Sequence, residues 1–459
     1  MRRLLFTLIV LFATTMLLTA CIYDENPVDF TLPALDSNEG IAIATSLFEQ
    51  VQTIWDEDNG EFWGERLDSP LMFADAITRV AITNMSDPEG LFFHPHGDVY
   101  MGILPDNIFI SNTASNFAGT IWGMMQWHDV HLIDEWHESQ IVRLLVHEGF
   151  HARQYDFIKG EWMVNQRLPH MFYADARTSV ALEMTALLAA LRSEGDERLQ
   201  HITNALSLRA SRRYNDPDAA RNENGQEMLE GMAWFTEHTL VAPNLNETLE
   251  MIEDWLDFAI DTAGFNMFGY FSGTLYGFLL DDTGAIWNRE LIWNTDLGEF
   301  LQNAMNITEL IPFEQLELEQ YDYTRISAIS TAWVISYNEM VQRAYEAVTN
   351  PSQRFILEGD FYFSDWVDAE TFFIGEHDEI LVTAGYFTIT GTNYIIDFND
   401  GHMSFLWMPI RGMYVGNAHN ITVSASGTQA TSPTWTLTVT DNNYHIVQSD
   451  DGLISVEQR

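Results

Sequence analysis

The hydrophobic positions along the chain change their period three times, which distinguishes four stretches. Residues 41–55 place apolar side chains three and four positions apart, which predicts an amphipathic helix. Between residues 62 and 110, short apolar runs alternate with turn sequences, which predicts hairpins or a small sheet. Helical spacing returns from residue 141 to about residue 349, and from residue 355 the period falls to two, as in strands.

This pattern predicts an α+β fold with a long helical centre and a C-terminal all-β domain. The sequence Asn-Pro-Ser at residues 350–352 marks the last boundary. We expect a mixed α/β part over residues 38–140, a helical core over residues 141–350 and the β domain over residues 351–459.

The first 20 residues have the pattern of a secretory signal peptide, with two arginines, an apolar stretch and small residues before Cys21. The ending resembles a bacterial lipobox, which implies cleavage before Cys21, lipidation of that residue and an extracytoplasmic protein held on a bacterial membrane. An ordinary signal peptide or membrane anchor is the alternative. Residues 21–37 would then form a tether. Cys21 is the only cysteine, so disulfides within the chain are excluded.

The composition restricts the partners. The formal net charge is −46, and Lys159 is the only lysine. Such a surface repels phosphate groups, so nucleic acid is not an expected partner. A hydrophobic content of 46% argues against a disordered chain.

The strongest chemical signal is His147-Glu148-Gly149-Phe150-His151 within the helical run. Residues four apart share one side of a helix, so both imidazoles can point at one position. Two imidazoles suit a tetrahedral Zn²⁺ that also takes a third protein ligand and a water. Glu148 lies on the adjacent side, where it can take a proton from that water. Gly149 costs the helix about 1 kcal/mol relative to alanine, so a requirement other than helix propensity favours a small residue there.

Two glutamates farther along the chain are candidates for the third ligand. Glu183 lies in an almost continuous apolar helix, where an unpaired charge is costly. It therefore needs an arginine, a metal or a metal-bound histidine as its partner. Glu230 begins the sequence Glu-Gly-Met-Ala-Trp-Phe at residues 230–235.

The histidine motif at residues 147–151 and the segment at residues 230–235 together resemble the gluzincin metallopeptidases. These are a group of the zincins in which a later helix supplies a glutamate ligand. In aminopeptidase-type members that helix reads Glu-Gly-x-Ala-x-aromatic. The resemblance implies a zincin-like catalytic core, Glu230 as the third ligand of Zn²⁺, Glu148 as the general base and a peptide or protein substrate.

The resemblance covers only the two motif helices. The interval of 79 residues between His151 and Glu230 is far longer than the usual spacing in the family. Glu183 therefore stays open as an alternative ligand, or as a residue that orients a ligand histidine.

Two further segments are candidates for substrate contacts. Residues 268–281 are rich in glycine and tyrosine, and either Tyr270 or Tyr276 can supply a hydroxyl that stabilises an oxyanion. We take Tyr276 as the catalytic candidate, and core packing is the alternative for both. Residues 111–114 are a candidate strand for pairing with an extended peptide, with a buried sheet edge as the alternative.

The sequence therefore predicts a membrane-tethered, extracytoplasmic, zinc-dependent peptidase. A surface lipoprotein that binds a metal or a partner protein without catalysis is the alternative. The presence of Glu148 between both histidines favours the enzyme, because an inactive descendant tends to lose its general base.

Overall fold

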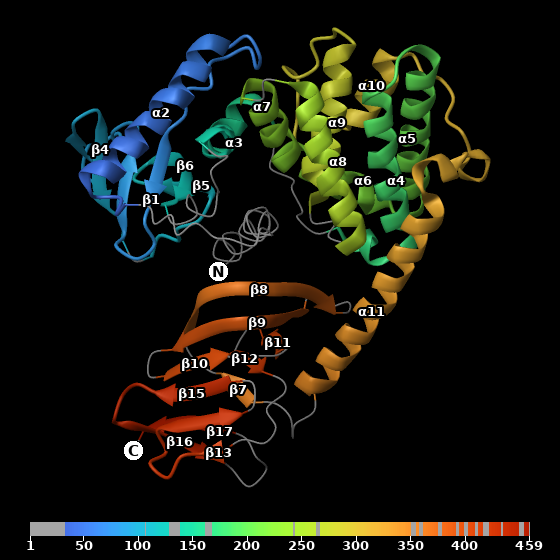
Figure 1. The fold of residues 1–459 in the computed structure, drawn as a ribbon. Helices are drawn as coiled ribbons and strands as arrows, with labels where there is room; N and C mark the ends of the chain where they lie inside the picture. The colour runs from blue at the N-terminus through green and yellow to red at the C-terminus, as the bar shows by residue number, and fades with distance from the viewer. Residues whose placement is uncertain are drawn as a thin grey trace. The chain divides into compact units, whose positions relative to one another are not determined.

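The structure is a computed structural model that describes most of the chain (Figure 1). It describes residues 33–105, 107–127, 138–160, 168–241, 244–262, 267–349, 355–357, 361–374, 379–391, 394–398, 403–408, 412–415, 422–432, 435–448 and 454–458. The predicted signal peptide, Cys21 and most of the tether lie outside these residues. The chain forms two compact units, residues 1–331 and 332–459. Helices and strands are both present, so the fold belongs to the α+β class.

The first helix, α2 (Asn38–Asp58), confirms the helix predicted over residues 41–55. The hydroxyl of Ser37 caps its start by accepting a hydrogen bond from the amide of Gly40 at 3.0 Å. The helix ends at Asn59, which adopts the left-handed conformation with φ 47°. Its apolar side chains, including Leu47 and Trp55, are buried in the core of the first unit.

A six-stranded sheet follows, with the order β3-β4-β2-β1-β6-β5. Strands β1 to β4 lie within residues 62–110, where the pattern predicted hairpins or a small sheet, and β5 and β6 follow that stretch. Its strands are β1 (Leu71–Ala74), β2 (Val80–Thr83), β3 (His94–His96), β4 (Val99–Ile103), β5 (Thr113–Phe117) and β6 (Thr120–Gln126). Strands β1 and β6 pair in parallel, and the other neighbours pair antiparallel. Strand β5 therefore forms one edge of this sheet.

The helix that carries the histidines, α3 (Glu138–Phe157), lies directly on this sheet. A Cβ atom added to Gly123 in β6 would meet the carbonyl carbon and oxygen of Glu148 at 2.6 Å. A Cβ atom on Gly149 would meet side chains of Leu71 and Trp55 at 3.2 Å. At Gly123 the strand and the helix approach backbone to backbone, and the side chains packed on Gly149 explain the small residue inside the motif.

The regular elements described in the rest of the first unit are helices, and Figure 1 shows them side by side. The elements are η2 (Pro169–Phe172), α4 (Ala174–Leu191), α5 (Gly195–Asn215), α6 (Pro217–Gln226), the π-helical turn η3 (Glu227–Gly231), α7 (Met232–Val241), α8 (Leu245–Thr262), α9 (Phe268–Asp282), α10 (Leu297–Ala304), η5 (Phe313–Gln315) and η6 (Leu318–Tyr321). Buried side chains of α2, α3, α4 and α9 belong to one hydrophobic cluster. Among the described residues, no helix is both long enough and apolar enough to span a membrane.

The long helix α11 (Tyr323–Thr349) contains the boundary between the two units. Beyond it come only strands in the described residues: β7 (Phe355–Leu357), β8 (Phe361–Ile374), β9 (Glu379–Gly391), β10 (Tyr394–Phe398), β11 (Met403–Met408), β12 (Gly412–Val415), β13 (Thr422–Val423), β14 (Gln429–Ser432), β15 (Trp435–Val439), β16 (Tyr444–Gln448) and β17 (Ile454–Gln458). Strands β7 to β15 form a nine-stranded sheet, and β16 pairs with β17. These strands occupy the region where the hydrophobic pattern has a period of two.

The contact between Gly123 and α3 yields a stability prediction. We expect Gly123→Ala to lower the free energy of unfolding by about 1–3 kcal/mol, because backbone atoms of Glu148 cannot rotate away from the new methyl group. Urea unfolding of residues 22–459 measures the change. Ile121→Ala is the control, since Ile121 is an exposed residue of the same strand. Equal stability of Gly123→Ala and the parent would contradict the close contact.

Candidate metal centre

Two histidines of α3 and one glutamate of the π-turn η3 bring three ligand atoms together. The Nε2 atoms of His147 and His151 lie 3.0 Å apart. Oε2 of Glu230 lies 3.7 Å from Nε2 of His147 and 3.3 Å from Nε2 of His151. Ligands of a tetrahedral zinc site with bonds of about 2.0–2.1 Å are separated by about 3.3 Å. The spacing and the donor types therefore fit a metal ion, and this buried group can bind one.

Each histidine has a polar partner on its other ring nitrogen. Nδ1 of His151 lies 2.9 Å from Oε1 of Gln154, an amide oxygen that can only accept a hydrogen bond. Nδ1 of His151 therefore carries the proton, and Nε2 presents its lone pair to the site. Nδ1 of His147 lies 3.0 Å from Oε2 of Glu237 in α7. Such partners orient the rings of metal-binding histidines and increase their basicity.

The charges of the centre favour a cation. Burial opposes a charged imidazole, but the hydrogen bonds with Glu230 and Glu237 outweigh it and raise the pKa of His147 to about 10. Burial alone would raise the pKa of Glu230, but His147 and His151 hold it well below its ordinary value. In the absence of a metal, a proton supplies the positive charge that these carboxylates require. A divalent cation can replace it.

Glu148 is fully buried beside the histidines, on the adjacent side of α3. Neither of its carboxylate oxygens has a hydrogen-bond partner among the described residues. Burial raises the pKa of Glu148 to about 7, although the positive charge of His147 acts in the opposite direction. A carboxylate with this pKa can take up and release a proton near neutral pH.

The structure separates the two candidate tyrosines of α9. The ring of Tyr270 stacks on the ring of His147, with 5.9 Å between centroids and 7° between planes. Burial and the charge of Glu230 raise the pKa of Tyr270, so its hydroxyl keeps its proton. Tyr276 instead donates a hydrogen bond to Glu183 at 2.8 Å. Residues six apart on a helix differ by about 120° in direction, so the two hydroxyls point to different places. Tyr270 therefore replaces Tyr276 as the candidate for stabilising an oxyanion.

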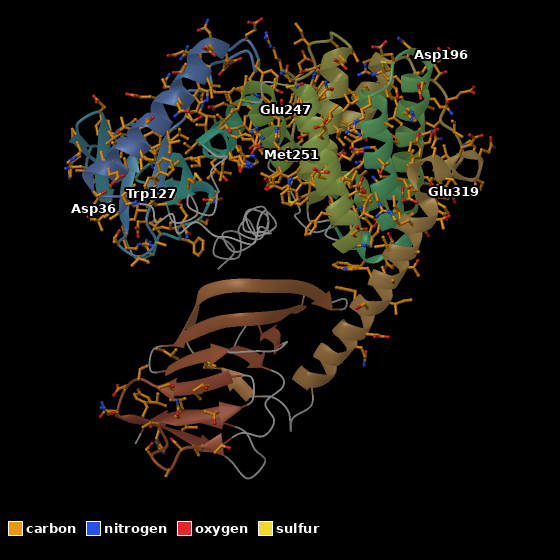
Figure 2. The ribbon with its side chains drawn as sticks, in the orientation of Figure 1. Asp36, Trp127, Asp196, Glu247, Met251 and Glu319 are labelled. Carbon is orange, nitrogen blue, oxygen red and sulfur yellow. The ribbon has the colours of Figure 1, made fainter. Side chains whose placement is uncertain are left out.

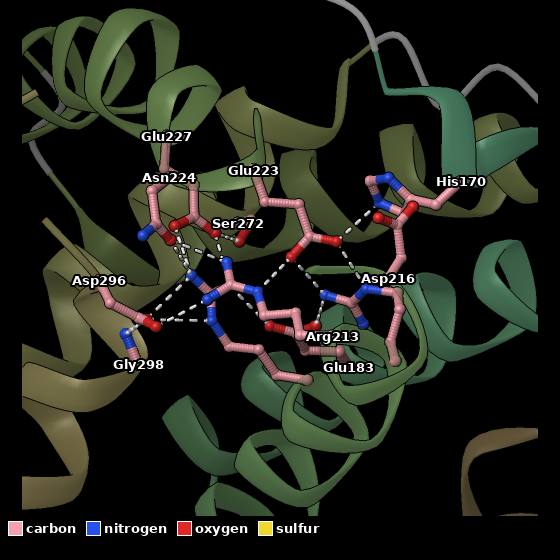
Figure 3. A network of polar contacts seen from close by, with 12 residues as sticks. His170, Glu183, Arg213, Asp216, Glu223, Asn224, Glu227, Ser272, Asp296 and Gly298 are labelled. Atoms are coloured by element: carbon pink, nitrogen blue, oxygen red, sulfur yellow. Dashed lines mark hydrogen bonds and ion pairs between the residues drawn. The ribbon is translucent and has the colours of Figure 1, made fainter. Parts of the chain in front are cut away.

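Glu183 has arginine partners, which is one of the three possibilities that its burial left open. Its carboxylate accepts hydrogen bonds from Arg212 at 2.6 Å and from Arg209 at 3.1 Å (Figure 3). The group that can bind a metal, as found among the described residues, does not include Glu183. Its position supports neither a ligand role nor contact with a ligand histidine.

Glu183 belongs to a buried network of ions, which we call the arginine network. Its members are Arg209, Arg212 and Arg213 of α5, Glu183 of α4, Glu223 of α6, Glu227 of η3, Asp296 and His170. The three arginines occupy positions i, i+3 and i+4 of one helix, so they share a side. That spacing, in a chain with so few cations, is a signal in the sequence that could have identified the network.

Strand β5 contains part of the segment predicted to pair with a peptide. Thr113 and Ala114 lie in β5, whereas Ser111 and Asn112 precede it. The strand is the sheet edge next to β6, which carries the contact with α3. An edge strand presents backbone groups that can pair with an extended chain.

Comparison of the chain with protein-family models, with curated proteins and with solved structures gave no match in any of the three. The geometry of the site therefore carries the functional argument.

The arrangement predicts which glutamate is required for metal binding. We expect purified residues 22–459 to contain about one zinc ion per chain, Glu230→Ala to lose it and Glu183→Gln to retain it. Elemental analysis by mass spectrometry gives the metal content. Loss from Glu183→Gln together with retention in Glu230→Ala would reverse the assignment.

The arginine network predicts a dependence of stability on pH. Burial alone would raise the pKa of Glu223, but Arg212, Arg213 and the hydrogen bond from His170 hold it well below its ordinary value. A carboxyl whose pKa is lower in the folded state stabilises the fold above its unfolded pKa of about 4.3. That contribution is lost as the pH falls toward the folded pKa.

We therefore expect Glu223→Gln to cost about 3–5 kcal/mol of unfolding free energy at pH 7. The difference from the parent should shrink as the pH falls below about 4.3. Urea unfolding between pH 7 and pH 3 measures it, with the exposed Glu197→Gln as the control. A difference that stays constant over this range would contradict the lowered pKa.

Proposed function

We propose that this protein is a zinc-dependent peptidase of gluzincin type. The observation that carries the proposal is the convergence of His147, His151 and Glu230, with Glu148 buried beside the histidines. The residue types, their spacing and their burial match what metal-assisted hydrolysis of a peptide bond requires. We also propose that the fold consists of a zincin-like core followed by a C-terminal all-β domain over residues 351–459.

The proposed roles follow from the chemistry of each group. When bound, a zinc ion supplies the Lewis acidity that polarises a scissile carbonyl and acidifies a water. Glu148 accepts the proton of that water on its carboxylate and delivers it to the leaving amine. Tyr270 donates its hydroxyl to the developing oxyanion. The edge strand β5 holds an extended peptide by backbone hydrogen bonds.

The proposed setting is outside the cytoplasm. Lipidation of Cys21 would tether the chain to a bacterial membrane, with residues 22–37 as a spacer. A peptide or protein is the proposed substrate, as the resemblance to the gluzincins implies. The net charge of −46 opposes binding to nucleic acid.

The mechanism predicts separate effects on metal binding and on turnover. We expect Glu148→Gln to lower the rate of peptide hydrolysis by at least about 100-fold, because the amide cannot accept the proton, while the zinc content stays unchanged. Digestion of casein and of a mixed peptide library, with and without a chelator, measures turnover. Asp156→Asn is the matched control, because Asp156 lies on α3 and is half-exposed.

Three results would count against the proposal. Undiminished turnover by Glu148→Gln would overturn the assigned general base. Hydrolysis that persists in the chelator would exclude a metal-dependent reaction. A parent that holds zinc but cleaves no substrate would favour the lipoprotein that binds a metal without catalysis.

A further inference from the structure

Glu230 lies in a π-turn that interrupts an otherwise continuous helix. Helix α6 passes directly into η3 and then into α7, with right-handed helical dihedrals at Gln226 and Met232 on either side. The amide of Met232 bonds to the carbonyl of Glu227, five residues earlier. Such a turn contains one residue more than an α-helical turn, and it changes the direction of the side chains within it.

This change of direction separates two glutamates that an α-helix would keep together. Residues three apart on an α-helix point within about 60° of each other. Here the carboxylate of Glu227 bonds to Arg209, whereas the carboxylate of Glu230 lies between His147 and His151. The π-turn therefore lets one short segment join the arginine network and the metal centre.

Glu227 is held more firmly than a single ion pair would hold it. Nη1 and Nη2 of Arg209 each donate to one oxygen of Glu227 at 2.7 Å, which is a bidentate pair. Ser272 of α9 also donates to Glu227 (Figure 3). The guanidinium of Arg209 lies 4.9 Å from the ring centre of Tyr276 and also bonds to Glu183. Arg209 is therefore fixed by α4 and α9 as well as by the turn.

Helix α3 also contacts the π-turn, through the side chain of Gln154. Nε2 of Gln154 donates to the carbonyl oxygens of Met228 and Leu229, both at 2.7 Å. Oε1 of the same amide lies 2.9 Å from Nδ1 of His151. Gln154 thus connects a ligand histidine with the segment that carries the ligand glutamate. These contacts fix Met228 and Leu229 against α3. A change in the shape of the turn after them would therefore move Glu230 relative to both histidines.

We propose that Arg209 is a positioning residue for the metal centre. Through its bidentate pair with Glu227, Arg209 holds the π-turn in the form that directs Glu230 toward His147 and His151. Without the guanidinium, the carboxylate of Glu227 would be buried with too few partners. Rotation of the turn relieves that cost, and it carries Glu230 away from the histidines. The inference rests on the metal centre of the proposed function, but not on peptidase activity.

The test compares two arginines of the same helix. Arg213 is also part of the arginine network and bonds to Glu223, Asn224 and Asp296, and none of these three partners lies in the π-turn. The variants are Arg209→Met and Arg209→Lys, with Arg213→Met and Arg213→Lys as matched controls. Affinity for Zn²⁺ is measured by competition with a chromophoric chelator, and thermal unfolding is measured on the same metal-free samples.

We expect Arg209→Met to weaken zinc binding by about 10- to 100-fold, as loss of a group that orients a metal ligand does. Arg209→Lys should have an intermediate affinity, because an ammonium cannot reproduce the bidentate fork. Both Arg213 variants should keep the affinity of the parent, even where they unfold at a lower temperature. Visible absorption of Co²⁺ in place of zinc should change in Arg209→Met and in neither Arg213 variant, since a change of ligand geometry alters that spectrum whereas lower stability does not.

Parental zinc affinity and an unchanged Co²⁺ spectrum in a folded Arg209→Met would overturn the inference. If that variant does not fold, Glu227→Gln replaces it, because the amide keeps the size of the side chain and loses the charge. Undiminished affinity in Glu227→Gln would likewise overturn it. A parent that binds no zinc would overturn the metal centre and this inference together. Zinc binding without peptide hydrolysis would overturn the proposed activity alone.

Discussion

The cost of burying carboxylates is the constraint on which the rest of the first unit depends. Glu148, Glu183, Glu223, Glu227 and Glu230 are all buried, and an ionised carboxylate away from water needs an opposite charge or several hydrogen bonds. Arginines of α5 meet this need for three of them. The histidines of α3, and in our proposal a metal ion, meet it at Glu230. Helices α3 to α9 are arranged so that four of these acids reach a partner, whereas neither carboxylate oxygen of Glu148 has a hydrogen-bond partner among the described residues.

The metal centre connects two parts of the first unit that are built differently. The histidines lie on α3, which is held against the sheet where Gly123 and Gly149 allow close approach. Glu230 comes from the helical part, where Gly231 allows equally close contact with α9: an added Cβ would lie 2.5 Å from the carbonyl oxygen of Gly269. The contacts at Gly123 and Gly231 are with backbone atoms, whereas Gly149 packs against the side chains of Leu71 and Trp55. Ligands placed in this way are preorganised for one geometry.

Much of the site could be read from local patterns. Helical spacing placed His147 and His151 on one side of a helix and Glu148 on the next, and burial within an apolar helix required a partner for Glu183. These inferences succeed because side chains up to four residues apart have relative positions that the helix itself sets. The sheet between residues 62 and 110 and the helices after residue 141 followed from the same kind of regularity.

Other features depended on contacts between segments that are distant in the sequence. Packing decided that Glu183 bonds to arginine, that Tyr270 rather than Tyr276 lies against His147, and that Glu237 contacts the ring of His147. The π-turn at Glu227–Gly231 changes the phase of a helix without any change in hydrophobic period. The sequence by itself therefore determined which residues could serve a metal and which helices carry them. Only the tertiary structure decided their partners and directions, because a helical period determines angles within one helix and not the rotation of one helix against another.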